Sequence, residues 1–168
     1  MRVTDIETRA TGVERAWAVF VPRAILGFVY VFAGLHKLMD TGATAFGALA
    51  AAQPDLARFL PAPLLVLSGT LTPFIELALG VLILAGLWTP SALRCLAVLL
   101  VSVTMAWGVA GLLHPVGATA MNTSVVNFYI LPRAALLILV LYLPRADDLL
   151  SVDALLARPT TDPRSLDA

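Results

Sequence analysis

The sequence predicts an all-α integral membrane protein, a bundle of four hydrophobic helices with both termini on the cytoplasmic side. Of its 168 residues, 60% are hydrophobic and only 13% are charged, whereas soluble domains usually have about 45–50% apolar and about 25% charged residues. A soluble fold of this length could not cover so much apolar surface, but a bilayer solvates it directly. Four apolar runs also reach the length of about 20 residues that a membrane-crossing helix needs.

Residues that begin or interrupt helices separate these runs. The four helices are expected at about residues 17–39, 63–87, 91–113 and 124–143. Pro90 suits the start of the third helix, where a missing N–H costs nothing. Pro144 ends the fourth helix, since proline disfavours the helical conformation in the residue before it. Within the longest connection, residues 40–62, the Ala- and Leu-rich stretch 43–52 predicts a short helix lying in the membrane interface.

The flanks of the helices predict domain bounds and orientation. Residues 1–16 form a cytoplasmic segment, residues 17–157 the transmembrane domain, and residues 158–168 a disordered tail with little apolar content. Most basic residues flank one end of the bundle: Arg2, Arg9, Arg15, Arg94, Arg145, Arg158 and Arg164. Because cytoplasmic flanks carry the excess of Lys and Arg, both termini are placed in the cytoplasm of a bacterial-type cell, with a multi-pass chain in its inner membrane. The first run is too long for a signal peptide and is expected to be retained.

Charge, cysteine and histidine content exclude several function classes. The formal net charge is zero, so nothing indicates a nucleic-acid partner. A single cysteine, Cys95, excludes an internal disulfide and a Cys-x-x-Cys redox pair. The two histidines, His36 and His114, each stand at a predicted helix end without metal-ligand spacing, so no metal site is predicted.

Three ionisable residues lie well inside the predicted helices: Arg23, Glu76 and Arg133. Each costs about 2.5–3.5 kcal/mol at a helix centre, so they should face the bundle interior and be paired. At about 1.5 Å per residue, Glu76 and Arg133 lie near mid-depth and Arg23 lies about 9 Å from the cytoplasmic end. Glu76 is therefore expected to reach Arg133, with Arg23 approaching from the cytoplasmic side. The three serve either as a ligand site or as a salt bridge that only fixes helix order.

Polar residues share helix faces with small ones. One face of the first helix carries Arg23, Gly27, Tyr30, Gly34 and Lys37, and one face of the second carries Gly69, Thr72, Glu76 and Gly80. Small residues allow helices to approach closely, and polar ones prefer the bundle interior. Tyr30 and Lys37 therefore join the candidates for ligand binding. A second candidate polar site near the outer interface includes His36, His114 and Asn127.

Three motifs stand in order along the chain. They are Arg23-Ala24-Ile25-Leu26-Gly27 running on to Gly34-Leu35-His36-Lys37, then Glu76-Leu77-Ala78-Leu79-Gly80 running on to Gly86-Leu87-Trp88-Thr89-Pro90, and finally Ser151-Val152-Asp153. In order and spacing, from about Arg23 to Leu155, they resemble the DoxX/DoxD family of small four-helix membrane proteins.

This resemblance implies a role near quinone chemistry. The family takes its name from the membrane subunit of a thiosulfate:quinone oxidoreductase, and other members are implicated in redox homeostasis with soluble partners. By analogy the chain is expected to bind quinone as its ligand, with no covalently bound cofactor. The resemblance directs attention to Arg23, Lys37 and Glu76. Arg133 is a candidate site residue only because of its estimated depth in the membrane.

Two hypotheses follow for the function. In the first, the chain is a subunit of a quinone-dependent oxidoreductase that binds quinone or anchors a redox partner. Glu76 then handles a proton or orients Arg133, and Arg23 and Lys37 stabilise developing charge. Its partners are the lipid bilayer and either another subunit or a second copy of the chain. In the alternative, it is a structural or anchoring subunit of a larger membrane complex, without a ligand. A solute permease is less favoured, because the sequence shows no internal repeat.

Overall fold

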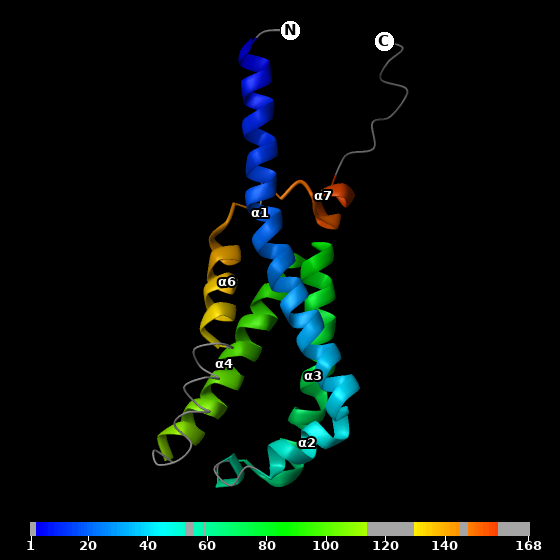
Figure 1. The fold of residues 1–168 in the computed structure, drawn as a ribbon, viewed down its shortest axis with the longest axis vertical. Coiled ribbons are helices and arrows are strands. Elements are labelled where there is room, and N and C mark those ends of the chain that lie inside the picture. Colours follow the sequence, from blue (N-terminus) through cyan, green and yellow to red (C-terminus); the bar gives the residue numbers. More distant parts are fainter. Residues whose placement is uncertain (1–2, 53–55, 59, 114–129, 145–147, 158–168) are drawn as a thin grey trace.

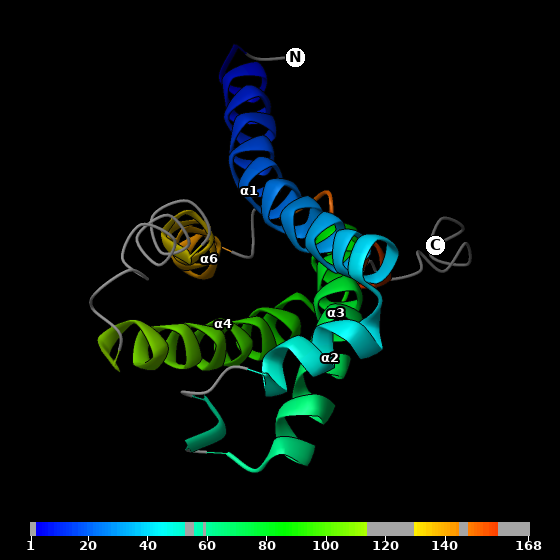
Figure 2. The ribbon, with the colours of Figure 1, turned by 60° about the horizontal axis from the view of Figure 1, so that its bottom comes forward.

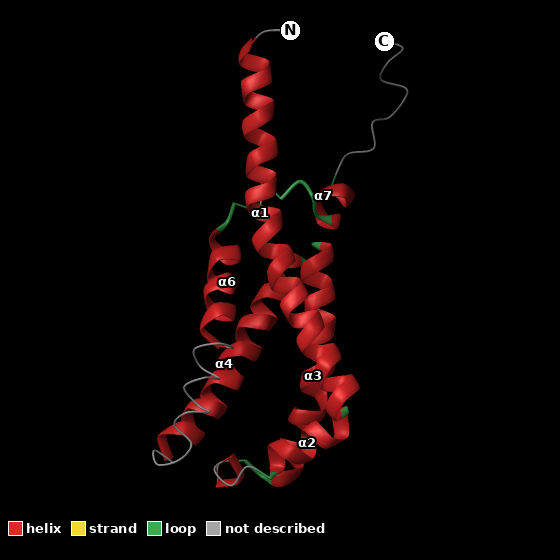
Figure 3. Cartoon of the chain, in the orientation of Figure 1, coloured by secondary structure: helices red, strands yellow, loops and turns green. Residues whose placement is uncertain are grey.

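A computed structural model describes residues 3–52, 56–58, 60–113, 130–144 and 148–157, and an all-α fold is confirmed for this part of the chain (Figure 3). The helices are α1 (Val3–His36), α2 (Ala43–Ala51), α3 (Ala62–Ala85), α4 (Thr89–Leu113), α6 (Leu131–Tyr142) and α7 (Val152–Leu156). A π-helical turn, η1 (Lys37–Thr41), follows α1, and a 3-10 turn, η2 (Leu56–Arg58), precedes α3.

The long helix α1 organises the fold. Figure 1 shows α3 running beside the second half of α1, with α2 near the start of α3 and α7 near its end. The helices α4 and α6 lie on the other side of α1, and the far end of α4 diverges from α3 in both views (Figures 1 and 2). The core sits where α1, α3, α4 and α6 meet, and its buried members include Leu26, Ile83, Leu96 and Leu137.

Two helical segments are long and apolar enough to cross a membrane, Gly12–Thr41 and Ala62–Ala85, and two shorter helices, Thr89–Met105 and Leu131–Tyr142, are also apolar. Large apolar side chains stand exposed on the outer faces, among them Phe28 and Phe32 on α1. Such surface is unfavourable in water and compatible with lipid. The expected fourth span, residues 124–143, is described only from residue 130 onward.

The bounds of α1 and α3 differ from those expected from hydropathy. The first helix begins at Val3 rather than near residue 17, so the charged segment 1–16 largely continues it. A polar sequence can extend an existing helix when it contains no strong breaker, and the one glycine there, Gly12, costs only about 1 kcal/mol. The helix α3 ends at Ala85, because Gly86 caps it in the left-handed conformation, with φ of 69°.

Glycines bring α1 and α3 into backbone contact. A Cβ on Gly27 would lie 2.8 Å from the backbone nitrogen of Leu84, and one on Gly80 would lie 2.6 Å from that of Val31. Gly34 approaches the backbone of α3 equally closely. No larger residue fits at these positions unless the helices move apart. The small-residue faces predicted for these two helices therefore pack against each other.

The short helix α2 packs on the first half of α3 in the same way. It covers Ala43–Ala51, inside the stretch where a short helix was expected. A Cβ on Gly69 of α3 would lie 2.8 Å from the Cα of Gly47 of α2. This contact places α2 and the η1 turn against α3, close to the end of α1.

Candidate functional site

Lys37, the first residue of η1, and Glu76, in the middle of α3, form a partly buried ion pair. The Nζ atom of Lys37 lies 2.5 Å from Oε2 of Glu76, whose side chain is only 4% exposed. The same ammonium group lies 5.2 Å from the ring centroid of Phe46 on α2. Gly34, one turn before Lys37, brings α1 against Leu77 and so places the lysine beside the carboxylate. A buried charge of this kind is tolerated only when it is paired.

Tyr30 carries a buried hydroxyl group without a hydrogen-bond partner. The residue is 2% exposed and belongs to the core, and its oxygen accepts and donates no bond within the described part of the chain. The guanidinium carbon of Arg133 lies 5.2 Å from its ring centroid, and the charges of both Arg133 and Glu76 act on it. Because buried tyrosine hydroxyls usually find a partner, this one is a candidate for binding a ligand.

We call Tyr30, Lys37, Glu76 and Arg133 the inner cluster. All four were candidates from the sequence, and the structure brings them together from α1, η1, α3 and α6. The carboxylate of Glu76 contacts Lys37 rather than Arg23. Arg133 follows Pro132 in the first described turn of α6. Near Glu76, Pro73 is buried inside α3.

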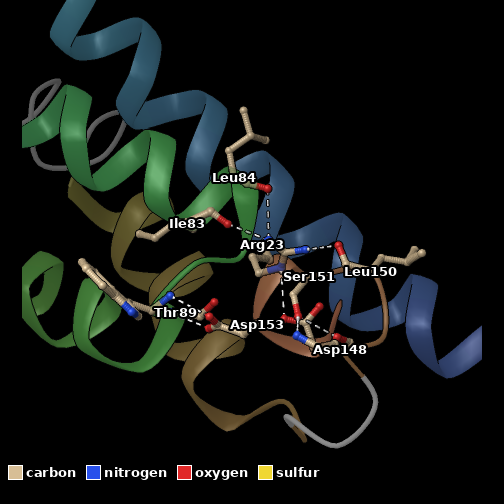
Figure 4. Close-up of polar contacts among 10 residues, drawn as sticks. Arg23, Ile83, Leu84, Thr89, Asp148, Leu150, Ser151 and Asp153 are labelled. Atoms are coloured by element: carbon tan, nitrogen blue, oxygen red, sulfur yellow. Dashed lines mark hydrogen bonds and ion pairs between the residues drawn. The ribbon is translucent and has the colours of Figure 1, made fainter. Parts of the chain in front are cut away.

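Arg23 lies in a separate polar site at the other end of α3. Its Nη1 donates to the carbonyl oxygens of Ile83 (2.7 Å) and Leu84 (3.0 Å), and its Nη2 donates to that of Leu150 (3.0 Å) (Figure 4). Its Nε lies 3.3 Å from Oδ2 of Asp148, and the residue is 1% exposed. The last carbonyls of a helix lack intrahelical donors and attract a cation, so Arg23 closes α3 and ties the C-terminal segment to it.

The expectation that Arg23 approaches Glu76 was wrong. Lys37, the partner of Glu76, follows Arg23 by about four helical turns, or about 21 Å along the axis. Only the estimated depths of the two residues in the membrane had favoured the Glu76 carboxylate as a partner of Arg23. The carbonyls of the last turn of α3 lie nearer, and Asp148 supplies the countercharge.

Asp153 joins the end of the chain to the turn between α3 and α4. Its two carboxylate oxygens accept the backbone N–H groups of Trp88 (3.0 Å) and Thr89 (3.2 Å) at the start of α4. Its own N–H donates to the carbonyl of Gly86 (3.1 Å). Trp88 adopts a positive φ of 47° in this turn. The carboxylate therefore does for α4 what an N-cap side chain does, from a distant segment.

Ser151 caps the short helix α7 that carries Asp153. Its hydroxyl accepts the N–H of Ala154 (3.1 Å) and donates to the carbonyl of Asp148 (2.9 Å). This is the usual contact of an N-cap serine. The Ser151-Val152-Asp153 motif is thus a pair of helix caps that closes one end of the bundle.

A cavity of about 280 Å³ lies beside these caps, lined by Thr89, Pro90, Asp148, Ser151, Asp153 and Ala154. Two atoms of its wall, Oγ1 of Thr89 and Oδ1 of Asp148, are buried without a hydrogen-bond partner. Burial raises the pKa of the Asp148 carboxyl above its ordinary value, even though the nearby Arg23 lowers it. Asp148 was not predicted as a site residue from the sequence. It follows the last apolar run, and no neighbouring residue indicates that its side chain is buried.

The second predicted site, at the outer end, is described only in part. His36 is mostly exposed and its Nδ1 lies 3.0 Å from Oδ2 of Asp40, as in a surface pair one helical turn apart. Both residues border a shallow hollow of about 320 Å³. His114 and Asn127 lie outside the described residues, so that site stays a prediction. Within the described ranges, no three His, Cys, Asp or Glu side chains are grouped to hold a metal ion.

Comparisons of the chain with protein-family models, with curated proteins and with solved structures found no match. The resemblance to the DoxX/DoxD family rests on the sequence motifs. The structure gives the polar residues of those motifs definite contacts: Arg23 and Asp153 close one end of the bundle, and Lys37 and Glu76 pair inside it.

Proposed function

We propose that the chain is a four-helix membrane protein of a bacterial-type inner membrane, with both termini in the cytoplasm, and that it serves quinone-linked oxidoreduction as a DoxX-like subunit. The two span-length helices, the shorter apolar helices and the exposed aromatic side chains support the membrane location. The basic residues flanking one end support the orientation.

The observation that carries the proposal is the buried, unpartnered hydroxyl of Tyr30, on which the charges of Arg133 and Glu76 both act. A quinone is an apolar ring with two carbonyl acceptors, and its reduction places negative charge on those oxygens. The tyrosine hydroxyl supplies a donor to one carbonyl. The cations Arg133 and Lys37 stabilise the developing charge, and charges act more strongly in a buried site than in water.

Reduction of a quinone to a quinol takes up two electrons and two protons. In this proposal the electrons come from a redox partner or from its reduced substrate. Lys37 and Glu76 share a proton-carrying contact between two helices, which suits the transfer of a proton to a reduced quinone oxygen. The chain therefore binds and orients the quinone, and the partner supplies the reducing equivalents.

Quinone retained by the gently extracted protein, measured by mass spectrometry, tests the proposal. The variant Tyr30→Phe removes only the hydroxyl, so it should fold as well as the wild type or better, since an unsatisfied buried polar group costs about 1–3 kcal/mol. If the hydroxyl binds quinone, retention should fall about tenfold, the worth of one hydrogen bond of about 1.4 kcal/mol.

The matched control is Tyr142→Phe, because Tyr142 is 85% exposed on α6 and lies away from the inner cluster. Its quinone retention should equal that of the wild type. The proposal fails if the wild type neither retains quinone nor binds it when quinone is added to nanodiscs, or if the Tyr30 variant retains as much as the control.

A structural or anchoring role is the second candidate, and a specific observation favours it. The ion pair of Lys37 and Glu76 is closed, and Arg23 is bonded to three carbonyl oxygens and a carboxylate. These contacts suffice to fix helix order without any ligand. A native pull-down that recovers a stable protein partner but no quinone, together with a Tyr30→Phe variant that is only more stable, would favour this role.

A further inference from the structure

The cavity under the α3–α4 turn contains two polar atoms that the protein leaves unsatisfied. Thr89 and Asp148 are each 9% exposed, and both line the cavity. Neither Oγ1 of Thr89 nor Oδ1 of Asp148 has a hydrogen-bond partner. Figure 4 shows both residues beside Ser151 and Asp153 at this end of the bundle. Because buried polar groups are almost always paired, two unsatisfied side chains lining one cavity make it a candidate binding site for a polar ligand.

A ligand that satisfies these atoms must donate hydrogen bonds, and the surrounding charges favour a cation. The available atoms of the lining residues are acceptors: Oδ1 of Asp148, Oγ1 of Thr89, and the carboxylate of Asp153, whose oxygens each accept one backbone bond and keep a free lone pair. The charges around it are one guanidinium, that of Arg23, and the two carboxylates. The wall therefore has a net charge of about minus one. An anion would be repelled, and a divalent metal would find too few ligands.

We propose that this cavity binds a primary ammonium group, presented by an aminophospholipid headgroup or by a small free amine. Three acceptors match the three N–H donors of an ammonium group. A quaternary ammonium, as in a choline headgroup, has no N–H and leaves both orphan atoms unsatisfied. The lipid source rests on the membrane location proposed above, whereas the ammonium chemistry does not.

The surroundings of the cavity favour the lipid source. The segment that carries Asp148 and Asp153 exposes Leu150, Leu155 and Leu156, and the turn opposite exposes Trp88. Leucine and tryptophan side chains in this arrangement are typical of a helix that lies in a membrane interface. An aminophospholipid whose acyl chains contact these side chains would hold its headgroup at the cavity.

The electrostatics of Asp148 agree with a cationic ligand. Burial raises the pKa of its carboxyl, and of the charged groups packed around it, Arg23 on α1 lowers that pKa and Asp153 on α7 raises it. The charge of Arg23 therefore offsets only part of the cost of burying this carboxylate. An ammonium group at Oδ1 would supply further positive charge and lower the pKa.

The test uses the full-length protein in nanodiscs that contain equal amounts of phosphatidylethanolamine, phosphatidylcholine and phosphatidylglycerol. After mild detergent release, native mass spectrometry counts the lipids that stay bound. The wild type should retain phosphatidylethanolamine at least about tenfold over the other two, the worth of one or two charge-assisted hydrogen bonds. Equal retention of the three lipids, with no effect of free amine, would overturn the proposal.

Two variants separate binding from folding. Asp148→Asn removes the charge but also disturbs the contact with Arg23. Thr89→Val removes only a hydroxyl that has no partner in the protein, so it should keep its fold and lose about tenfold in phosphatidylethanolamine retention. Thr104→Val on the same helix, away from the cavity, is the matched control. If Thr89→Val retains the lipid as well as the control does, the proposal is wrong.

A competition experiment identifies the source of the ammonium group. Ethanolamine or methylammonium is added to protein in detergent without lipid, and thermal stability is measured. Stabilisation of wild type but not of Thr89→Val, without lipid selectivity, assigns the site to a small amine. Lipid selectivity without amine stabilisation assigns it to the headgroup. Tyr30→Phe should leave the lipid selectivity and the stabilisation by added amine unchanged, so failure of the quinone proposal does not affect this one.

Discussion

Replacing Arg23 with methionine should release the C-terminal segment from the bundle. In the structure this one side chain holds the carbonyls of Ile83, Leu84 and Leu150 and the carboxylate of Asp148. Methionine fills much of the same space without donating a hydrogen bond. The segment from residue 148 to 157 would then be attached mainly through Asp153 and its contacts with the α3–α4 turn.

The expected size of the effect follows from the buried carboxylate. Asp148 is mostly buried, and removing the partner of a buried ion pair costs about 3–5 kcal/mol, because the remaining charge is left uncompensated. The lost hydrogen bonds each contribute about 1.5–3 kcal/mol as bonds to a charged group, but these values overlap with the ion-pair cost and do not add. A docking loss of about 3–5 kcal/mol is therefore expected, a factor of more than about a hundred in the docked population.

Hydrogen exchange of the backbone amides between residues 150 and 157 measures this docking. Protection at Asp153 and Leu155, whose amides bond to Gly86 and Ser151, should fall about a hundredfold or more in Arg23→Met. The double variant with Asp148→Leu should recover most of it, since replacing both partners of a buried pair with apolar groups is often neutral. Unchanged protection in the single variant, or no recovery in the double, would refute the reasoning.

Two further predictions concern helix packing and pH. Gly80→Ala should lower stability by about 1–3 kcal/mol, since its Cβ would lie 2.6 Å from the backbone of Val31. The control Gly12→Ala, whose Cβ would contact nothing, should be neutral or stabilising by up to about 1 kcal/mol. Equal melting temperatures of the two variants would contradict this prediction. The folded pKa of Asp148 is raised, so its contribution to docking is fully present below its ordinary pKa and is lost as pH rises through the raised value. Hydrogen exchange should therefore show tighter docking in acid, and the Arg23→Met defect should shrink there; a defect that grows in acid would contradict this.

Hydropathy predicted the apolar helices but not the start of α1. The amphipathic and charged sequence before residue 17 contains no apolar run, so a membrane-span criterion ignores it, although it continues the helix from Val3. The end of α3 was misplaced for a related reason. Leu87 and Trp88 are apolar, but Gly86 had already ended the helix in a left-handed cap.

The residue types of the candidate site were predictable, while their pairing was not. A buried glutamate and lysine on opposed helix faces stand out in an apolar sequence. Their contact depends on how closely Gly34 lets α1 approach α3, which is a packing property. The partners of Arg23 could not be predicted for a different reason. They are mainly backbone carbonyls, which every residue has, and only the fold determines which of them lie within reach of the guanidinium group.

The two proposed ligand sites share one physical feature, a buried hydroxyl group that the protein does not satisfy. If no ligand binds, deleting such a hydroxyl removes a desolvation cost, and Tyr30→Phe and Thr89→Val should both raise stability. If a ligand bonds to the hydroxyl in the native membrane, the same deletion removes a stabilising contact, and the apparent stability should fall in the presence of that ligand. The sign of the change, measured with and without quinone for Tyr30 and with and without an ammonium ligand for Thr89, therefore distinguishes a binding site from a packing defect at each position.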